Sequence, residues 1–110
     1  MRKLKKEEYD LILFLIKDKP NSEHIIAELS DVFVEEMNDG GMGSLEFLNK
    51  ERAGRKYGPT MAQIQLPDND GIPLLISVDL DKDGDIFELD VWKCDFSKLI
   101  QFPLPPYNPL

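Results

Sequence analysis

The chain has 110 residues, a single cysteine and a formal net charge of −8. This length fits a single domain over residues 1–110. Cys94 has no intrachain partner for a disulfide, and the apolar run at residues 11–16 is far too short to cross a bilayer. We therefore expect a cytoplasmic protein without a membrane anchor, and its acidity argues against nucleic-acid binding.

The first third of the chain predicts two helices. Residues 7–17 are apolar around much of a helical circumference, so this helix should be well buried. Pro20 ends it. Asn21 or Ser22 can then cap a second, short helix that continues to about Leu29.

The remainder predicts strands and loops. Three glycines within residues 39–43 indicate a turn, and the polar, basic residues 50–59 indicate a mobile loop. Four prolines make residues 102–110 an extended tail. The predicted strands cover residues 30–38, 44–49, 60–66, 72–80 and 86–94.

These elements together predict an α+β fold. Two N-terminal helices would pack on one face of a mostly antiparallel β-meander of about five strands. The other face of the sheet would be open to solvent.

The centre of the predicted fold is a hairpin around the turn Asp81 to Gly84, where an Asp-Gly pair stands between two alternating segments. The alternation places Phe87, Leu89 and Val91 on the core side of the second strand. It leaves the other set, Ile86, Glu88, Asp90, Trp92 and Cys94, on the opposite side.

The open face is the predicted recognition surface. An aromatic ring among carboxylates and amides is typical of a binding site, although a partly buried Trp92 on a solvated acidic face is an equally good interpretation. A negative face of this kind suits a basic protein partner. The predicted partner-binding residues are Gln63, Gln65, Glu88, Asp90 and Trp92.

The acidic hairpin also offers a possible Ca²⁺ site. Asp79, Asp81 and Asp83 occupy positions 1, 3 and 5 of a calcium-loop pattern, and Gly84 and Asp90 occupy positions 6 and 12. The alternative is a solvated hairpin turn, which the flanking strand patterns favour. The predicted metal ligands are Asp79, Asp81, Asp83, Asp85 and Asp90.

No catalytic constellation stands out. Glu88 and Asp90 lie on one side of a strand, about 7 Å apart, which is a spacing that acid–base pairs also use. His24 has no neighbouring histidine or cysteine, so we expect a surface position or a capping role. A small enzyme with an unrecognised site stays open as an alternative.

Two segments, residues 39–45 (D-G-G-M-G-S-L) and residues 88–96 (E-L-D-V-W-K-C-D-F), resemble a small bacterial family of uncharacterised proteins, a domain of unknown function. The resemblance covers most of the chain and implies no catalytic residue. The small size and acidity are also like those of immunity proteins, which bind and neutralise a toxin domain. We therefore expect a non-enzymatic interaction module, of which an immunity-type inhibitor is one form.

Overall fold

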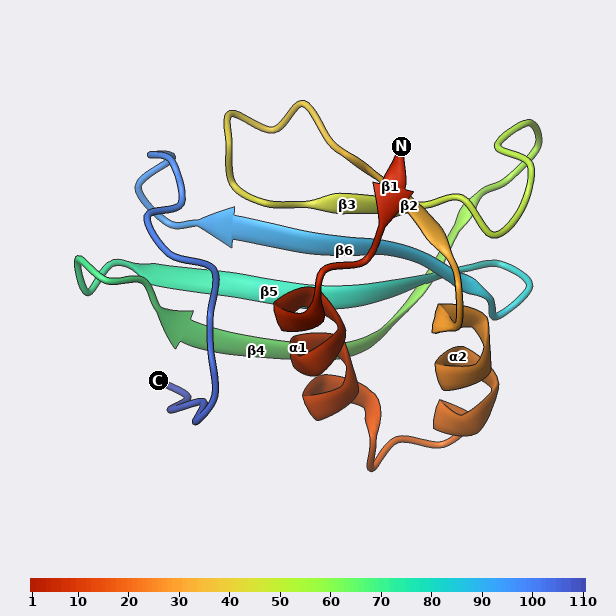
Figure 1. Ribbon diagram of the computed structural model, residues 1–110, viewed down its shortest axis with the longest axis horizontal. Helices are drawn as coiled ribbons and strands as arrows, with labels where there is room; N and C mark the ends of the chain where they lie inside the picture. The colour runs from red at the N-terminus through yellow and green to blue at the C-terminus, as the bar shows by residue number, and fades with distance from the viewer.

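The computed structural model describes residues 1–110 and contains two helices and one six-stranded sheet (Figure 1). Helix α1 spans Lys6–Ile16 and α2 spans Ser22–Leu29. The predicted α+β class is confirmed, with six strands where about five were expected. The strands are β1 (Arg2–Lys3), β2 (Phe33–Glu36), β3 (Leu45–Phe47), β4 (Tyr57–Pro67), β5 (Pro73–Asp81) and β6 (Ile86–Lys93).

The sheet is antiparallel throughout, in the order β1-β2-β3-β6-β5-β4. Strand β6, and not β4, lies beside β3, so the hairpin β2–β3 and the meander β4–β5–β6 join at that pair. Strand β1 was not predicted. Its two residues pair with β2 and are too few to show any alternation.

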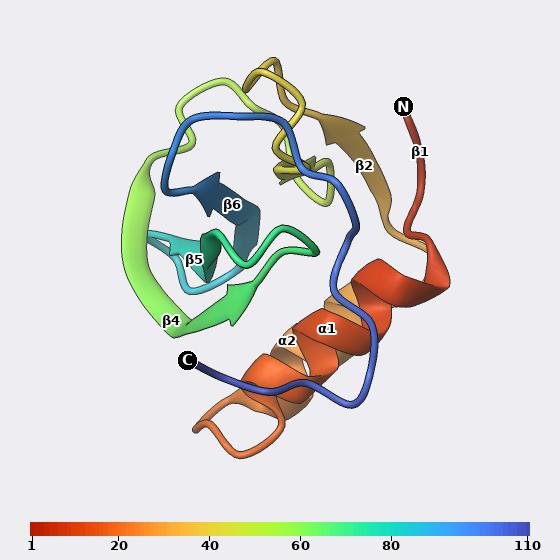
Figure 2. The same cartoon turned by 90° about the vertical axis from the view of Figure 1, so that its left-hand side faces the viewer.

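Both helices lie on the same side of the sheet (Figure 2). The core comprises 18 buried residues. Helix α1 contributes four of them, Leu11, Ile12, Leu15 and Ile16, as its apolar circumference predicted. Neither helix has the length and apolar character that a membrane span requires.

The helix ends differ in how their first backbone groups are satisfied. At α1 the buried Glu8 carboxylate accepts the Lys5 N–H at 2.9 Å and two Arg2 guanidinium bonds at 2.8 Å. At α2 the predicted side-chain cap is wrong, because neither Asn21 nor Ser22 makes a capping bond with its side chain. Asn21 holds the cap position with a left-handed backbone (φ 64°), and its side chain makes no capping bond.

The β5–β6 hairpin is confirmed, but a bulge changes which side chains face the core. Asp79 pairs with Glu88 while Leu80 pairs with Ile86, so Phe87 is an extra residue in β6. Ile86 therefore points into the core and is fully buried, contrary to the simple alternation. Phe87 packs instead against Tyr57, with ring centroids 4.8 Å apart.

Two irregular segments are held by specific contacts. Strand β4 begins at Tyr57, inside the predicted loop 50–59, and Arg55 of that loop has a side chain only 3% exposed. The tail, residues 102–110, contains no helix or strand and lies beside α1. It is held there by Tyr107, whose ring is 4.6 Å from that of Phe14, and by a bond of 2.9 Å from the Leu110 N–H to the Gln65 carbonyl.

Candidate interaction surface

The sheet face opposite the helices carries a row of carboxylates across four adjacent strands. Glu35 on β2 pairs with Glu46 on β3, Glu46 pairs with Glu88 on β6, and Glu88 pairs with Asp79 on β5. Side chains at directly paired positions lie about 5 Å apart, and like charges there are destabilising. The strand pairing therefore concentrates negative charge that is scattered along the sequence.

The predicted partner-binding residues occupy the next rows of the same face. Asp90 pairs with Ser77, which pairs with Gln63. One row further, Trp92 pairs with Leu75, which pairs with Gln65. The five predicted residues thus lie on one face of the sheet, on strands β4 and β6, which flank β5.

Two residues of this face are covered. Glu88 is 6% exposed and Ser77 is 7% exposed. Glu88 does lie outside the apolar core, but the Tyr57 hydroxyl donates a hydrogen bond to its carboxylate and covers it. Tyr57 falls in a segment that sequence analysis assigned to a loop, and only its β-strand pairing with Asp81 brings it here.

Three carboxylates at the centre of this face have no cationic partner, and we call Asp79, Glu88 and Asp90 the outer carboxylates. No salt bridge of the chain includes any of them. Their hydrogen-bond donors are neutral hydroxyls, those of Tyr57, Thr60, Ser44 and Ser77.

The electrostatic cost of this arrangement appears in two pKa shifts. Burial raises the pKa of Glu88, against the opposing bond from Tyr57, and the charge of Asp79 adds to the rise. Burial likewise raises the pKa of Asp90, and Asp79 again adds to it. The outer carboxylates therefore repel one another, and the hydroxyl donors offset this repulsion only in part.

Exposed aromatic rings lie next to the outer carboxylates. Trp92 is 42% exposed and makes an edge-to-face contact with Phe96, at 4.8 Å between ring centroids. Phe96 is itself 69% exposed. Phe96 lies beyond the last predicted strand, so period-two alternation gave no indication that this ring would extend the aromatic surface.

The predicted metal ligands do not form one group. Asp81, Asp83 and Asp85, which we call the hairpin carboxylates, surround the Lys50 ammonium at 2.9, 3.0 and 3.0 Å. Asp79 and Asp90 belong to the outer carboxylates instead. A calcium ion at the hairpin carboxylates would therefore have to displace Lys50.

Asp81 is the most enclosed of the hairpin carboxylates. Its side chain is 2% exposed, and Arg55 Nε donates to it at 2.9 Å. Burial alone would raise its pKa, but Lys50, the neighbouring backbone N–H groups and Arg55 together hold the pKa of Asp81 well below its usual value. Sequence analysis missed both cations because they lie some 30 residues before the hairpin.

Comparison with known proteins identifies the family. Searches of curated proteins and of solved structures found no match. A family model described as "Domain of unknown function (DUF6984)" matches residues 1–103. This match covers nearly the whole fold, including both helices, all six strands and the outer carboxylates. The chain therefore belongs to the DUF6984 family.

Proposed function

We propose that the protein is a cytoplasmic, non-enzymatic interaction module that binds a basic protein through the outer carboxylates and Trp92. The observation that carries this proposal is the group of three adjacent carboxylates without a cationic partner on an open sheet face. An immunity-type inhibitor, which masks a basic toxin domain, is the kind of protein that fits this surface.

Charge supports the proposal through both rate and affinity. A compact negative face steers a cationic partner toward it and speeds association. A lysine or arginine of the partner would relieve the repulsion between Asp79 and Glu88, where the free protein supplies no cation. The same face repels phosphate groups, so nucleic acid is not the proposed partner.

Shape and composition support it as well. Tryptophan often dominates the energy of an interface, because it buries a large rigid surface at little cost in conformational entropy. Trp92 lies at the end of the carboxylate group, and Gln63 and Gln65 provide hydrogen-bonding groups on the same face, two strands away. This combination adds polar groups to one aromatic anchor.

The test compares two triple variants as baits for co-purification from the native host. The outer variant is Asp79→Asn/Glu88→Gln/Asp90→Asn. The control variant is Glu7→Gln/Asp18→Asn/Glu23→Gln, on the helix side of the molecule. Each removes three negative charges from the formal −8 of the chain, so net charge is matched.

We expect the wild-type protein and the control variant to recover the same basic protein at low salt. The outer variant should recover much less of it, and added salt should weaken recovery by the other two. Equal recovery by all three baits, or no specific protein with any of them, would contradict the proposal.

A further inference from the structure

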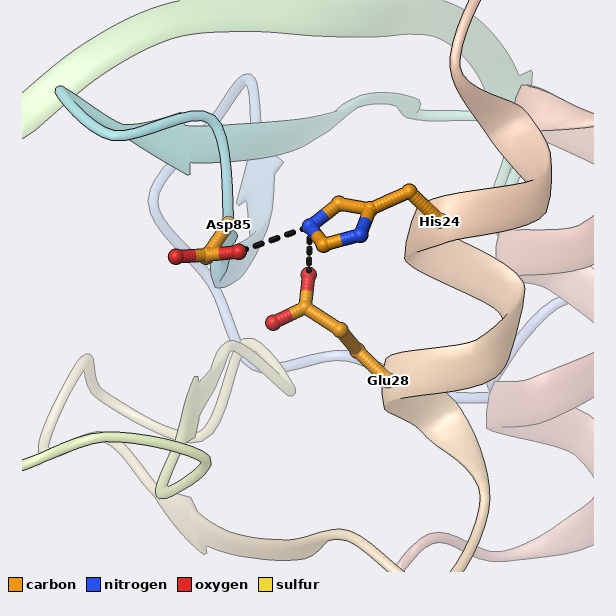
Figure 3. A group of neighbouring side chains, drawn as sticks. All are labelled: His24, Glu28 and Asp85. Carbon is orange, nitrogen blue, oxygen red and sulfur yellow. Dashed lines mark hydrogen bonds and ion pairs between the residues drawn. The ribbon is translucent and has the colours of Figure 1, made fainter.

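Three potential metal ligands meet on the helix side of the hairpin, away from the outer carboxylates. His24 and Glu28 lie one turn apart on α2, and Asp85 lies in the turn between β5 and β6 (Figure 3). The His24 Nε2 is 2.7 Å from Asp85 Oδ1 and 3.5 Å from Glu28 Oε1. The three ligand atoms all lie within 4.8 Å of one another.

Further hydrogen bonds hold both carboxylates in place. Glu28 Oε2 accepts from the Asn49 amide at 2.7 Å, and its Oε1 accepts the Ile86 N–H at 3.0 Å. Asp85 Oδ2 accepts from Lys50 at 3.0 Å, which leaves Oδ1 directed at the imidazole. Hydrogen bonds to the ligand side chains, such as these, fix the orientation of the ligands in protein metal sites.

From this geometry we propose that His24, Glu28 and Asp85 bind one divalent transition-metal ion of the Zn²⁺ class. Zn²⁺ sits about 2.0–2.2 Å from nitrogen and carboxylate oxygen, so the ligands of a tetrahedral site are about 3.3–3.6 Å apart. The His24–Glu28 distance already fits. Asp85 has to withdraw by less than about 1 Å to admit the ion.

The local charge suits a dication. Glu28 and the hairpin carboxylates contribute four negative charges, and Lys50 and Arg55 contribute two positive ones. With His24 neutral, the net charge of two negative units equals that of the ion in magnitude.

The ligand set favours Zn²⁺ over Ca²⁺. Calcium takes six to eight oxygen ligands, whereas this site offers one nitrogen and two carboxylates. His24 is 57% exposed, so solvent can reach the remaining coordination position. This site shares only Asp85 with the metal ligands predicted from the hairpin sequence, and it does not depend on the proposed partner surface.

The ion would connect α2 to the β5–β6 turn, so its binding should stabilise the folded chain. The test uses full-length protein stripped with chelator, with Cys94→Ser as the background so that the free thiol cannot bind the metal. Zn²⁺ is titrated by calorimetry, and the imidazole signals are followed by NMR. Because the chain has one histidine, those signals belong to His24.

We expect one Zn²⁺ per chain, a shift of the His24 imidazole signals and a rise of several degrees in Tm. His24→Ala should weaken binding by at least about tenfold. Glu23→Gln, which removes a neighbouring carboxylate of α2 that is not a ligand, should leave binding unchanged. Visible absorption of the Co²⁺ form would report the coordination geometry independently.

Two results would overturn the proposal. One is Zn²⁺ affinity that is the same in His24→Ala and in the background protein, both shown to be folded by circular dichroism. The other is a response of the imidazole signals to millimolar Ca²⁺ but not to Zn²⁺.

Discussion

The β5–β6 hairpin carries two groups of three carboxylates, and the protein surrounds them differently. The hairpin carboxylates enclose Lys50, and Asp81 is also bound by Arg55. The outer carboxylates, a few residues away on the same two strands, have only neutral hydroxyl donors. A run of acids in sequence is therefore not one site in space.

The comparison separates carboxylates that stabilise the fold from carboxylates that we propose bind a partner. Charges that the chain neutralises itself are explained by stability, because a buried carboxylate needs a cation or several N–H donors. Charges that it leaves unneutralised lower stability, so a role outside folding is the better explanation for them. This contrast is why we assign partner binding to the outer carboxylates.

The largest expected effect is the loss of Arg55. Its guanidinium pairs with Asp81 and lies 4.5 Å from the Phe87 ring centroid. Because the site is buried, water cannot replace the guanidinium as the partner of Asp81. We expect Arg55→Ala to lower the free energy of unfolding by about 3 kcal/mol, measured by urea denaturation. Arg52→Ala is the control, since that side chain is 67% exposed and should cost about 1 kcal/mol or less. Similar losses in both variants would contradict the assignment.

We expect an intermediate loss of stability when Asp68 is protonated by acid. Like Asp81, Asp68 is a buried carboxylate bound by a cation and by backbone N–H groups. Asp68 has no exposed side-chain surface and lies 2.8 Å from Lys93 Nζ. Burial opposes ionisation, but the Ile100 N–H and the Lys93 ammonium outweigh it and lower the pKa of Asp68 to about 2.

Because the folded pKa lies below the unfolded value, ionised Asp68 contributes stability above about pH 4 that is lost as the pH falls toward 2. We expect wild type to lose about 1–2 kcal/mol more than Asp68→Asn over this range. Denaturation curves of both proteins from pH 5 to pH 2 measure it. Parallel losses would show that Asp68 is not a stabilising carboxylate.

The smallest expected effect has the opposite sign. Glu88→Gln should raise the free energy of unfolding at pH 7 by about 0.2–1 kcal/mol, because it removes a like charge between Glu46 and Asp79. The pKa of Glu88 is raised in the folded state, so the wild-type protein regains this stability on protonation and the difference should vanish at low pH.

The matched control is Asp83→Asn in the hairpin carboxylates. Asp83 is 79% exposed and pairs with Lys50, so neutralising it should cost stability by less than about 1 kcal/mol. Changes of the same sign in Glu88→Gln and Asp83→Asn would remove the distinction between the two groups.

Sequence alone predicts much of this arrangement and misses a definable part of it. Period-two alternation correctly gives β5 and β6 and puts Asp90 and Trp92 on the open face. The predicted side of Phe87 is wrong, because a bulge inserts this residue into β6 and shifts the period-two pattern by one position. Ile86 and Phe87 exchange sides as a result.

The other omissions concern distant partners. Lys50 and Arg55 meet the hairpin carboxylates only after the chain has folded, and a basic loop 50–59 has no periodicity that points there. The same is true of Tyr57 above Glu88 and of His24 beside Asp85. The local alternation of residues predicts which side of a strand each side chain faces. Contacts between residues far apart in the sequence decide which carboxylates are paired with a cation.

Photo-crosslinking in host cells tests the binding surface most directly. A photo-reactive phenylalanine analogue would replace Trp92, and in a matched protein it would replace Glu23 on the exposed side of α2. Our account predicts a covalent adduct with a basic protein from position 92 and none from position 23. Adducts from position 23 alone, or equal adducts from both positions, would contradict the assignment of partner binding to the outer face.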